Sequence, residues 1–361
     1  MEGEAGFKRV TLFPDGDSRR AKAGEVRNRL YSVLREHNPQ AVAVPGWSDT
    51  GALLALTWCL ESRKPCILMS DSSAVGRSRS RWKELPKRQL VALFSSALVA
   101  GKPHTSYLAG LGMPRERAFF GYDAVDNRYF TDKAAEVRGH RSEVRRKYGL
   151  PERYFLASAR FITEKNLPRL IQAYARYREL ALKAESGKRK PEIWSLVLLG
   201  DGPLKADLCR LISDLSLQHC VVLPGFKQYD ELPVYYGLAS AFILPSVSET
   251  WGLVVNEAMA SSLPVLVSNR CGCAADLVQE GRNGFTFDPY NVEHLAALML
   301  KMSAVSFPLS ALGAESQRII ANWGPDRFAQ GLKAAVDKAL EVGPIKPTLT
   351  QKLILKALLL R

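Results

Sequence analysis

Short apolar runs alternate with longer stretches of helical periodicity along the whole chain. In the first part, the runs predict strands at Arg9–Phe13, Ala41–Pro45, Cys66–Ser70, Ala97–Ala100 and Ala118–Tyr122. The segments between them predict helices at Ala23–His37, Thr50–Ser62, Trp82–Phe94 and His104–Leu111. Because parallel strands are joined by a crossover that is usually a helix, this alternation predicts an α/β fold with a parallel sheet.

A second series of the same kind begins after a charged helical stretch at Asp132–Tyr148. Its predicted strands are Tyr154–Ser158, Ser195–Leu199, Val221–Pro224, Ala241–Pro245, Pro264–Ser268 and Gly284–Asp288, with helical patterns such as Asn291–Met302 between them. Two doubly wound sheets are therefore expected. In such sheets ligands bind at the carboxyl ends of the strands, so the loops that follow the strands are the first place to seek a site.

The length of the chain favours two domains, because 361 residues exceed the size at which one hydrophobic core usually stops growing. We place the first domain at residues 1–127 and the second at residues 128–340. A C-terminal helix over residues 341–361 is expected to return to the first domain, with contact to lipid as the alternative.

Cysteine usage and the lack of a long apolar run favour a cytoplasmic protein. The six cysteines are scattered through apolar segments, without the dense pairing of a secreted scaffold. Met1–Phe7 resembles no signal peptide, and no run of about 18 apolar residues occurs. Cys271 and Cys273 form a C-x-C pair that can chelate or oxidise, but we interpret them as packing residues because no partner ligands lie nearby.

The net charge of +14 favours anionic partners: nucleic acid, an acidic membrane surface or a sugar nucleotide. Much of the excess lies in Arg77–Lys83 and in Lys87 and Arg88, just before an apolar run. This pattern predicts a basic amphipathic helix, either a solvated surface helix or one in peripheral contact with an anionic membrane. No recognisable nucleic-acid-binding motif accompanies it, so no nucleic-acid partner is expected.

The most informative stretch, Ala241–Ala260, runs from a strand through a loop into a helix that should begin near Gly252. The first turn of a helix has unpaired N–H groups that can bind a phosphate, and glycine permits close approach. Glu249 precedes this turn and Glu257 follows it, so a carboxylate can reach each side of a diphosphate and accept hydrogen bonds from sugar hydroxyls. Spacing alone leaves open that acidic residues simply favour helix N-termini.

Four further segments occur in the same part of the chain. They are Ser158–Asn166, Val197–Pro203, Val222–Phe226 and Asn283–Phe285. With the E-x7-E spacing of Glu249 and Glu257, they resemble in their order the retaining glycosyltransferases of the GT-B fold, most closely family 4 (glycosyl transferases group 1). The resemblance covers about residues 150–300. Taken singly, the segments are turns, or, for Arg160 and Lys165, a surface pair beside Glu164.

The resemblance implies the GT-B fold, in which two Rossmann-like doubly wound domains face each other across a cleft. The first domain would bind the acceptor and the second the nucleotide-sugar donor, UDP- or GDP-linked. It also implies a retaining, metal-independent transfer of a hexose, with no cofactor, to a glycan, glycolipid or small-molecule acceptor. One alternative is an epimerase of the same fold that releases free sugar, and another is a catalytically inactive donor-binding protein.

The resemblance also implies roles for residues at the donor phosphates. Glu249 would hold the hydroxyls of the transferred sugar, and the amides of Gly252 and Leu253 would bind the phosphate. Arg160 and Lys165 would stabilise the departing diphosphate as negative charge develops on it.

The nucleoside end of the donor has its own candidates. Glu257 would hold the ribose, while Gly200 and Gly202 form the family's glycine turn and Phe226 lies in the loop around the nucleobase. A competing candidate for a metal site is the D-x-D of Asp15 and Asp17, which binds a divalent cation in glycosyltransferases of the other major fold but is also a common turn.

The first domain departs from the family pattern. The usual opening strand and glycine-rich loop are not recognised, so we expect a shortened first domain without its opening βαβ unit. Our acceptor-side candidates follow predicted strand ends or start a helix, and they are Asp71, Ser70, Trp47 and His104. A lone histidine at a helix start is more often structural. Asp123 and Asp126 lie in a segment that resembles the one leading to the interdomain hinge.

Overall fold

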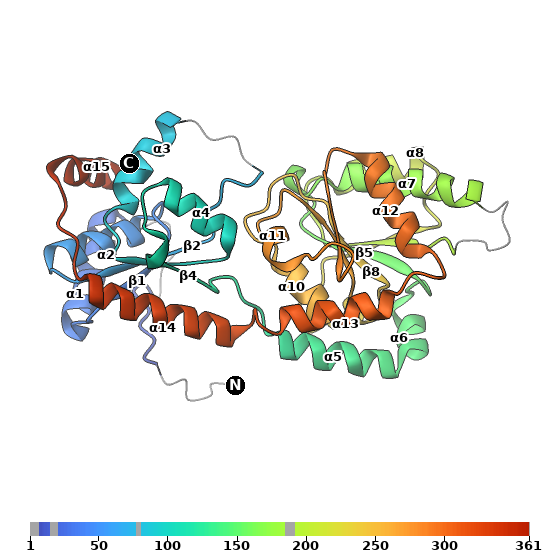
Figure 1. Cartoon of the computed structure of the whole chain (residues 1–361), viewed down its shortest axis with the longest axis horizontal. Helices are drawn as coiled ribbons and strands as arrows, with labels where there is room; N and C mark the ends of the chain where they lie inside the picture. Colours follow the sequence, from blue (N-terminus) through green and yellow to red (C-terminus); the bar gives the residue numbers. More distant parts are fainter. Residues whose placement is uncertain (1–6, 15–20, 77–80, 185–191, 361) are drawn as a thin grey trace.

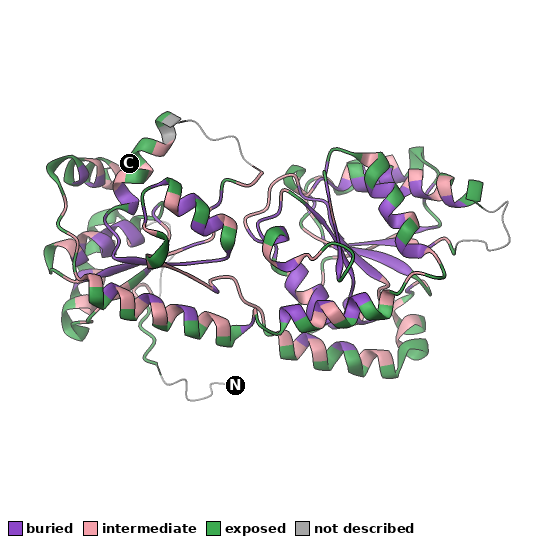
Figure 2. Cartoon of the chain, viewed as in Figure 1, coloured by how far each residue is buried: buried purple, intermediate pink, exposed green. Residues whose placement is uncertain are grey.

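The computed structural model of the chain describes residues 7–14, 21–76, 81–184 and 192–360. It is an α/β structure with two parallel sheets, one of four strands and one of six. Figure 1 shows each sheet in its own half of the molecule with helices packed around it. Figure 2 shows that the strands of the six-stranded sheet are mostly buried, while the helices alternate between buried and exposed faces. The predicted α/β class is confirmed.

The first sheet has the order β1-β2-β3-β4, and its strands follow one another directly in the chain. They are β1 (Val42–Pro45), β2 (Cys66–Ser70), β3 (Ser96–Val99) and β4 (Ala118–Phe120). The helices that accompany them are α1 (Ala23–His37), α2 (Thr50–Glu61), α3 (Arg81–Val91) and α4 (Lys102–Gly110). In the described part of this sheet the order does not reverse, so the double winding predicted for it is not found there.

One predicted strand is wrong. Residues Arg9–Phe13 form no strand and are largely exposed. Their backbone lies against α1, where the Arg29 guanidinium donates to the Leu12 carbonyl at 2.7 Å and stacks over the Phe13 ring. A short apolar run between Lys8 and Pro14 has too little hydrophobic surface to be buried on both faces, as an inner parallel strand would be.

The second sheet has the order β10-β9-β8-β5-β6-β7, which reverses between β5 and β8 as in a doubly wound fold. All six predicted strands are confirmed: β5 (Tyr154–Ser158), β6 (Ser195–Leu199), β7 (Val221–Gly225), β8 (Ala241–Leu244), β9 (Val265–Ser268) and β10 (Gly284–Phe287). Its helices are α7 (Leu167–Ala184), α8 (Lys205–Asp214), α9 (Leu232–Leu238), α10 (Leu253–Ala260), α11 (Ala274–Leu277), α12 (Val292–Ser303) and α13 (Leu309–Ile320).

The charged stretch between the sheets forms two helices, α5 (Asn127–Gly139) and α6 (Arg141–Tyr148). After α13 the chain crosses back, because α14 (Pro325–Val342) lies along the first sheet and the Ser96 hydroxyl donates to the Ala335 carbonyl at 2.6 Å. The last helix, α15 (Leu349–Leu359), packs on α2 and α3. From the sequence we place the end of the second domain at residue 340. Because α14 packs on the first sheet, we propose instead that the chain crosses back to the first domain near Gly324.

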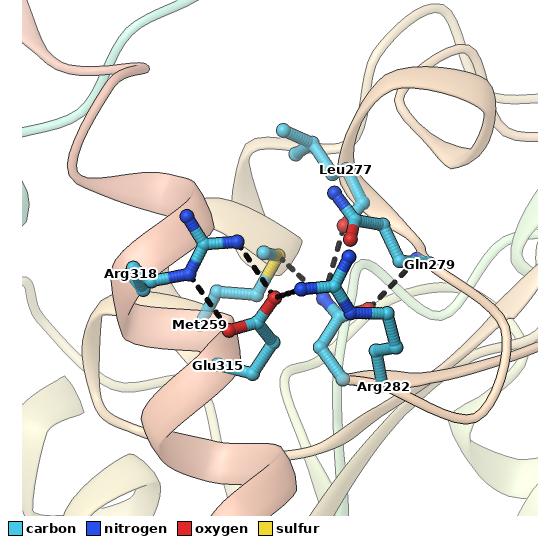
Figure 3. A network of polar contacts seen from close by, with 7 residues as sticks. Met259, Leu277, Gln279, Arg282, Glu315 and Arg318 are labelled. Carbon is cyan, nitrogen blue, oxygen red and sulfur yellow. Dashed lines mark hydrogen bonds and ion pairs between the residues drawn. The ribbon is translucent and has the colours of Figure 1, made fainter.

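An arginine–carboxylate cluster fixes α13 to the loop before β10 (Figure 3). The Glu315 carboxylate accepts hydrogen bonds from Arg282 and Arg318, each at 2.7 Å. In the same loop the buried Asn283 side chain donates to the Leu277 carbonyl at 2.9 Å. None of the helices in the described ranges is both long enough and apolar enough to cross a bilayer.

Candidate active site

The loops after β5, β8 and β10 are held together by one side chain, that of Asn166. Its buried amide donates to the carbonyls of Pro245 at 3.1 Å and Pro289 at 2.9 Å. Its backbone is left-handed, with φ of 56°, a conformation that asparagine tolerates better than most residues. Beyond the residue type, no sequence pattern indicated this role. Asn166 therefore fixes the floor of the site at the point where the strand order reverses.

Within this floor, the predicted residues Lys165 and Glu249 form an ion pair. The Lys165 ammonium donates to the Glu249 carboxylate, and the two side chains are only 16% and 15% exposed. The Ser246 hydroxyl also donates to Glu249 at 3.4 Å. The backbone of Glu249 bridges to Cys271, which sets the acidic loop against the segment after β9. The structure thus brings a cation and a carboxylate from different loops to one point.

The two cysteines of that segment are buried and face the interior. Burial raises the pKa of the Cys271 thiol and of the Cys273 thiol, so both are protonated at neutral pH. This position agrees with a packing role. The described residues contain no group of three or more histidine, cysteine, aspartate or glutamate side chains arranged to hold a metal. Asp15 and Asp17 lie outside the described residues.

The helix start predicted near Gly252 is confirmed, since α10 begins at Leu253. Gly252 has φ of 106°, and a Cβ atom there would lie 2.9 Å from a Leu244 methyl and 3.4 Å from the Glu249 side chain. Only glycine fits this position without strain. The Val255 amide already donates to the Gly252 carbonyl at 2.9 Å. The amides of Gly252 and Leu253, which precede the hydrogen-bonded part of the helix, are those that can face an anion beside Glu249.

Glu257 lies just over one turn into α10, and its carboxylate accepts a hydrogen bond of 2.7 Å from the Tyr236 hydroxyl. Burial raises the pKa of Glu257 from 4.5 to about 7, although the bond from Tyr236 acts in the opposite direction. Tyr236 comes from α9 and is itself fully buried. Sequence reasoning missed this tyrosine, because no local pattern links it to Glu257. The pair fixes the carboxylate that we expect at the ribose.

Arg160 and the glycine turn meet at the end of β5. Arg160 is exposed just after the strand, whereas a Cβ atom on Gly200 would lie 1.9 Å from the Ala159 carbonyl oxygen. A Cβ atom on Gly202 would lie 2.7 Å from the Phe161 carbonyl oxygen. The two glycines are therefore required by the close packing of their turn against the loop that carries Arg160. Phe226, which is 66% exposed, follows β7 at the same edge of the sheet.

His104 connects the two halves of the molecule. Its ring is fully buried, its Nδ1 accepts from the Gly101 amide at 3.2 Å, and its Nε2 lies 3.0 Å from the Thr250 carbonyl oxygen. These partners imply the neutral tautomer with the proton on Nε2, and burial lowers the pKa of His104 in agreement. Thr250 directly follows Glu249. His104 thus occupies a structural position that joins α4 to the acidic loop.

A second contact joins the halves at the start of α4. The buried Asp276 carboxylate, on α11, accepts from the Lys102 amide at 2.9 Å and so caps α4 from the other domain. Gly101 must be small there, because a Cβ atom would lie 2.2 Å from that carboxylate. Together with His104, this cap holds α4 next to the loop of Glu249.

Two carboxylates of the first domain lie near each other, and one of them, Asp123, also lies near Glu249. Asp71 follows β2 and Asp123 follows β4. Burial, and then the negative charges of Asp71 and Glu249, raise the pKa of Asp123 to about 7. Its Oδ2 atom is buried and has no hydrogen-bond partner among the described residues. We expected Asp123 only in the segment before the hinge, and the structure places its carboxyl group within electrostatic range of the acidic loop.

The remaining acceptor-side candidates are buried in the first domain. Trp47 packs in the core of that domain. The Ser70 hydroxyl is buried and accepts from the Ser72 amide at 3.1 Å. Of the four candidates, only Asp71 keeps appreciable exposure. Asp71, with Asp123, is therefore the acceptor-side candidate that keeps its side chain partly open to solvent.

The two parallel α/β halves, with a reversal of strand order in the second sheet, agree with the GT-B fold. Residues 140–309 match the family described as Glycosyl transferases group 1, and this part of the chain belongs to that family. The resemblance inferred from the sequence is thereby confirmed.

Solved structures agree on the fold. HepE of Anabaena, solved in complex with UDP, superposes with a TM-score of 0.69 at 18% identity, over 86% of this chain and 82% of that one. Sucrose-phosphate synthase of Thermosynechococcus elongatus gives 0.67 at 17% identity, over 88% and 78%.

Among curated relatives, a GDP-mannose-dependent phosphatidylinositol monomannoside mannosyltransferase of Mycobacterium tuberculosis is 28% identical over 84% of this chain and 77% of its own length. A sulfoquinovosyl transferase of Arabidopsis thaliana is 45% identical, over 27% of this chain and 19% of its own length. An α-D-kanosaminyltransferase of Streptomyces kanamyceticus is 31% identical, over 51% and 44%. The chain thus spans less than half the length of two of these relatives.

Proposed function

We propose that the protein is a retaining glycosyltransferase that moves a hexose from a nucleoside diphosphate sugar to an acceptor. The observation that supports this most strongly is the position of the Lys165–Glu249 pair directly before the glycine-capped start of α10. Three segments meet there: the start of α10 offers amides to a diphosphate, Lys165 offers a cation to its charge, and Glu249 offers a carboxylate to the attached sugar. Family membership supports the retaining outcome and the nucleotide-sugar donor.

In this proposal the donor diphosphate binds at the first amides of α10. Lys165 then shares its ammonium between Glu249 and the phosphate, and Arg160, exposed at the end of β5, approaches from the other side. Both cations stabilise the diphosphate as it leaves with the bonding electron pair, while Glu249 accepts hydrogen bonds from the sugar. Glu257, held by Tyr236, accepts from the ribose hydroxyls.

On the acceptor side, we propose that Asp71 and Asp123 bind the acceptor hydroxyl. The unpartnered Oδ2 of Asp123 supports this, because a buried carboxyl oxygen gains stability from a hydrogen-bond donor supplied by a ligand. These residues lie in the first domain, near the sugar-binding end of the Glu249 loop. His104 and Asp276, which join the domains, would keep the two sides at a fixed separation.

We further propose that the acceptor carries a lipid. A largely apolar groove of about 920 Å³ lies between α3 and α4 and includes Ala74 and Val75, just after the loop of Asp71. Trp82 at its edge is 82% exposed. Next to α3, the outer face of α15 exposes leucines alternating with Lys352 and Lys356. An apolar face with cations favours contact with an anionic membrane, where such an acceptor resides.

A donor panel tests the transfer reaction and its alternatives. The full chain is incubated with UDP- and GDP-linked hexoses, with and without anionic vesicles that contain glycolipid acceptors, and both nucleoside diphosphate and sugar products are measured. We expect diphosphate release that depends on the acceptor and yields a glycosylated lipid. Free sugar without acceptor would favour the epimerase alternative. Donor binding with no product under any condition would favour the inactive binding protein.

A further inference from the structure

An arginine-lined pocket lies at the amino ends of β5, β8 and β9, the edge of the second sheet opposite the candidate active site. It has a volume of about 530 Å³, enough for a small organic ligand. Residues just before each of these strands line it, namely Arg153, Ser240 and Pro264. The opposite walls come from α5, α6 and α13, which lie together in the lower right of Figure 1.

The lining of the pocket carries a strong positive charge. It includes four arginines, Arg138, Arg141, Arg145 and Arg153. Glu152 is the one acid among the described residues that line it, and it pairs with Arg145 at 3.1 Å. The acid of α13, Glu315, does not line the pocket and instead binds Arg282 and Arg318 (Figure 3). Outside the lining, Glu192 lies 3.4 Å from Arg153 at the exposed rim.

Two of the arginines are oriented by the ends of helices. Arg138 donates to the Ser261 carbonyl at 3.0 Å, just past α10, and Arg145 donates to the Leu238 carbonyl at the end of α9 at 3.3 Å. Helix C-termini attract cations, which accounts for these contacts but not for the rest of the charge. Arg141 is exposed and has no ion pair or hydrogen bond from its side chain within the described ranges.

The buried arginine atoms are not fully satisfied. The Nε of Arg145 is buried and has no hydrogen-bond partner in the described structure. Arg138 is partly desolvated, and this burial lowers the pKa of its guanidinium, so the charged form is destabilised in its present surroundings. A bound anion would relieve both costs, because guanidinium groups pair with phosphate oxygens through two parallel hydrogen bonds.

We propose that this pocket binds a small organic phosphate, separately from the donor. The arginines and the hydroxyls of Ser240 and Ser310 would hold the phosphate, and the apolar wall of Leu263 and Leu309 would contact the carbon skeleton. The helix α10 joins the two sites. Its first residue, Leu253, lies at the proposed donor-phosphate site, and Ser261, which follows its last residue, lies about 12 Å from Leu253 along the helix axis. The proposal does not depend on which transfer reaction the protein catalyses.

Binding of a hexose monophosphate and of inorganic pyrophosphate to the full chain, measured by calorimetry at low salt, tests the site. The pocket variant is Arg141→Glu, and the control is Arg146→Glu, an exposed arginine on the same helix that does not line the pocket. Lys165→Ala serves as the donor-site variant. We expect saturable binding of at least one probe in the wild type and the control, and affinity weaker by about fivefold or more in Arg141→Glu.

Lys165→Ala separates the pocket from the donor site. Probe affinity that survives in Lys165→Ala but falls in Arg141→Glu supports the arginine pocket. Three results would overturn it: no saturable binding of either probe, equal affinity in Arg141→Glu and Arg146→Glu, or loss of binding in Lys165→Ala alone. Circular dichroism of each variant ensures that folded proteins are compared.

Discussion

Lys165 and Glu249, which are separated by 83 intervening residues, meet as an ion pair at the carboxyl edge of the second sheet. The contact joins the loop after β5 to the loop after β8, where the strand order reverses. Both side chains are mostly buried. In the function proposed above, this cation would contact the diphosphate and this carboxylate would contact its sugar.

Removing either partner of this pair should lower turnover. We expect Lys165→Ala and Glu249→Ala each to reduce it by about tenfold or more, because each loses a charge that acts on the leaving diphosphate or on the sugar. The measurement is the rate of nucleoside diphosphate release. Glu164→Ala, an exposed neighbour, is the control and should stay near wild type. Unchanged rates in folded Lys165→Ala and Glu249→Ala would contradict the assignment.

Gly252→Ala should destabilise the protein and weaken donor binding. The left-handed backbone and the 2.9 Å approach to Leu244 together predict a loss of about 1–3 kcal/mol in the free energy of unfolding. Gly112→Ala is a matched control, because Gly112 has a similar φ of 100° but no atom within 4 Å of the added Cβ. Urea unfolding should show a larger loss of stability for Gly252→Ala than for Gly112→Ala. Donor titration should show weaker affinity only for Gly252→Ala.

The stability of the protein should depend on pH through Glu257. Its pKa is about 7 in the folded state against 4.5 as the reference value, so the folded state holds the proton more tightly. The contribution of neutral Glu257 to the free energy of unfolding is fully present below pH 4.5. It is lost as the pH rises to 7 and above, by up to about 3 kcal/mol. Asp123, whose pKa is also about 7, adds a loss in a similar range.

Glu257→Gln isolates this contribution. The amide cannot ionise, so the variant should gain stability relative to the wild type between pH 5 and pH 8, as measured by urea unfolding across that range. Tyr236→Phe removes the bond that lowers the pKa of Glu257, and should extend the pH-dependent loss to higher pH. If Glu257→Gln and the wild type show the same pH profile, the carboxylate is not desolvated as described.

Membrane contact should depend on α3 and α15. We expect Trp82→Ala and the double change Lys352→Glu with Lys356→Glu each to reduce sedimentation with anionic vesicles, because they remove an exposed apolar anchor and two cations. Neutral vesicles should bind weakly in every case. Arg210→Glu, on the exposed face of α8 in the other domain, controls for net charge. Equal sedimentation of all variants would contradict this surface.

The sequence predicted the second domain well because its strands are buried on both faces and appear as continuous apolar runs. The start of α10 was predictable from Gly252, since a glycine before an apolar helix indicates a special backbone geometry. The same reasoning failed for Arg9–Phe13, where a short apolar run lies on the surface along α1. Apolar runs of that length do not by themselves distinguish a strand from a surface segment.

What the sequence did not predict are the contacts between distant segments. Tyr236 reaches Glu257 from another helix, and Asp276 caps α4 from the other domain. His104 was open to two interpretations until the structure placed its ring against Thr250. These partners are joined only by the packing of the elements that carry them, so neither spacing nor residue type marks them. The approach of Asp123 to Asp71 and to Glu249 likewise depends on how the elements pack.

The central claim is that the donor diphosphate binds at the first turn of α10. The most direct measurement is a crystal structure of the full chain with UDP or GDP bound. We expect the diphosphate at the amides of Gly252 and Leu253, with Lys165 in contact and the ribose at Glu257. A nucleotide bound elsewhere, with the amides of α10 open to solvent, would contradict the account.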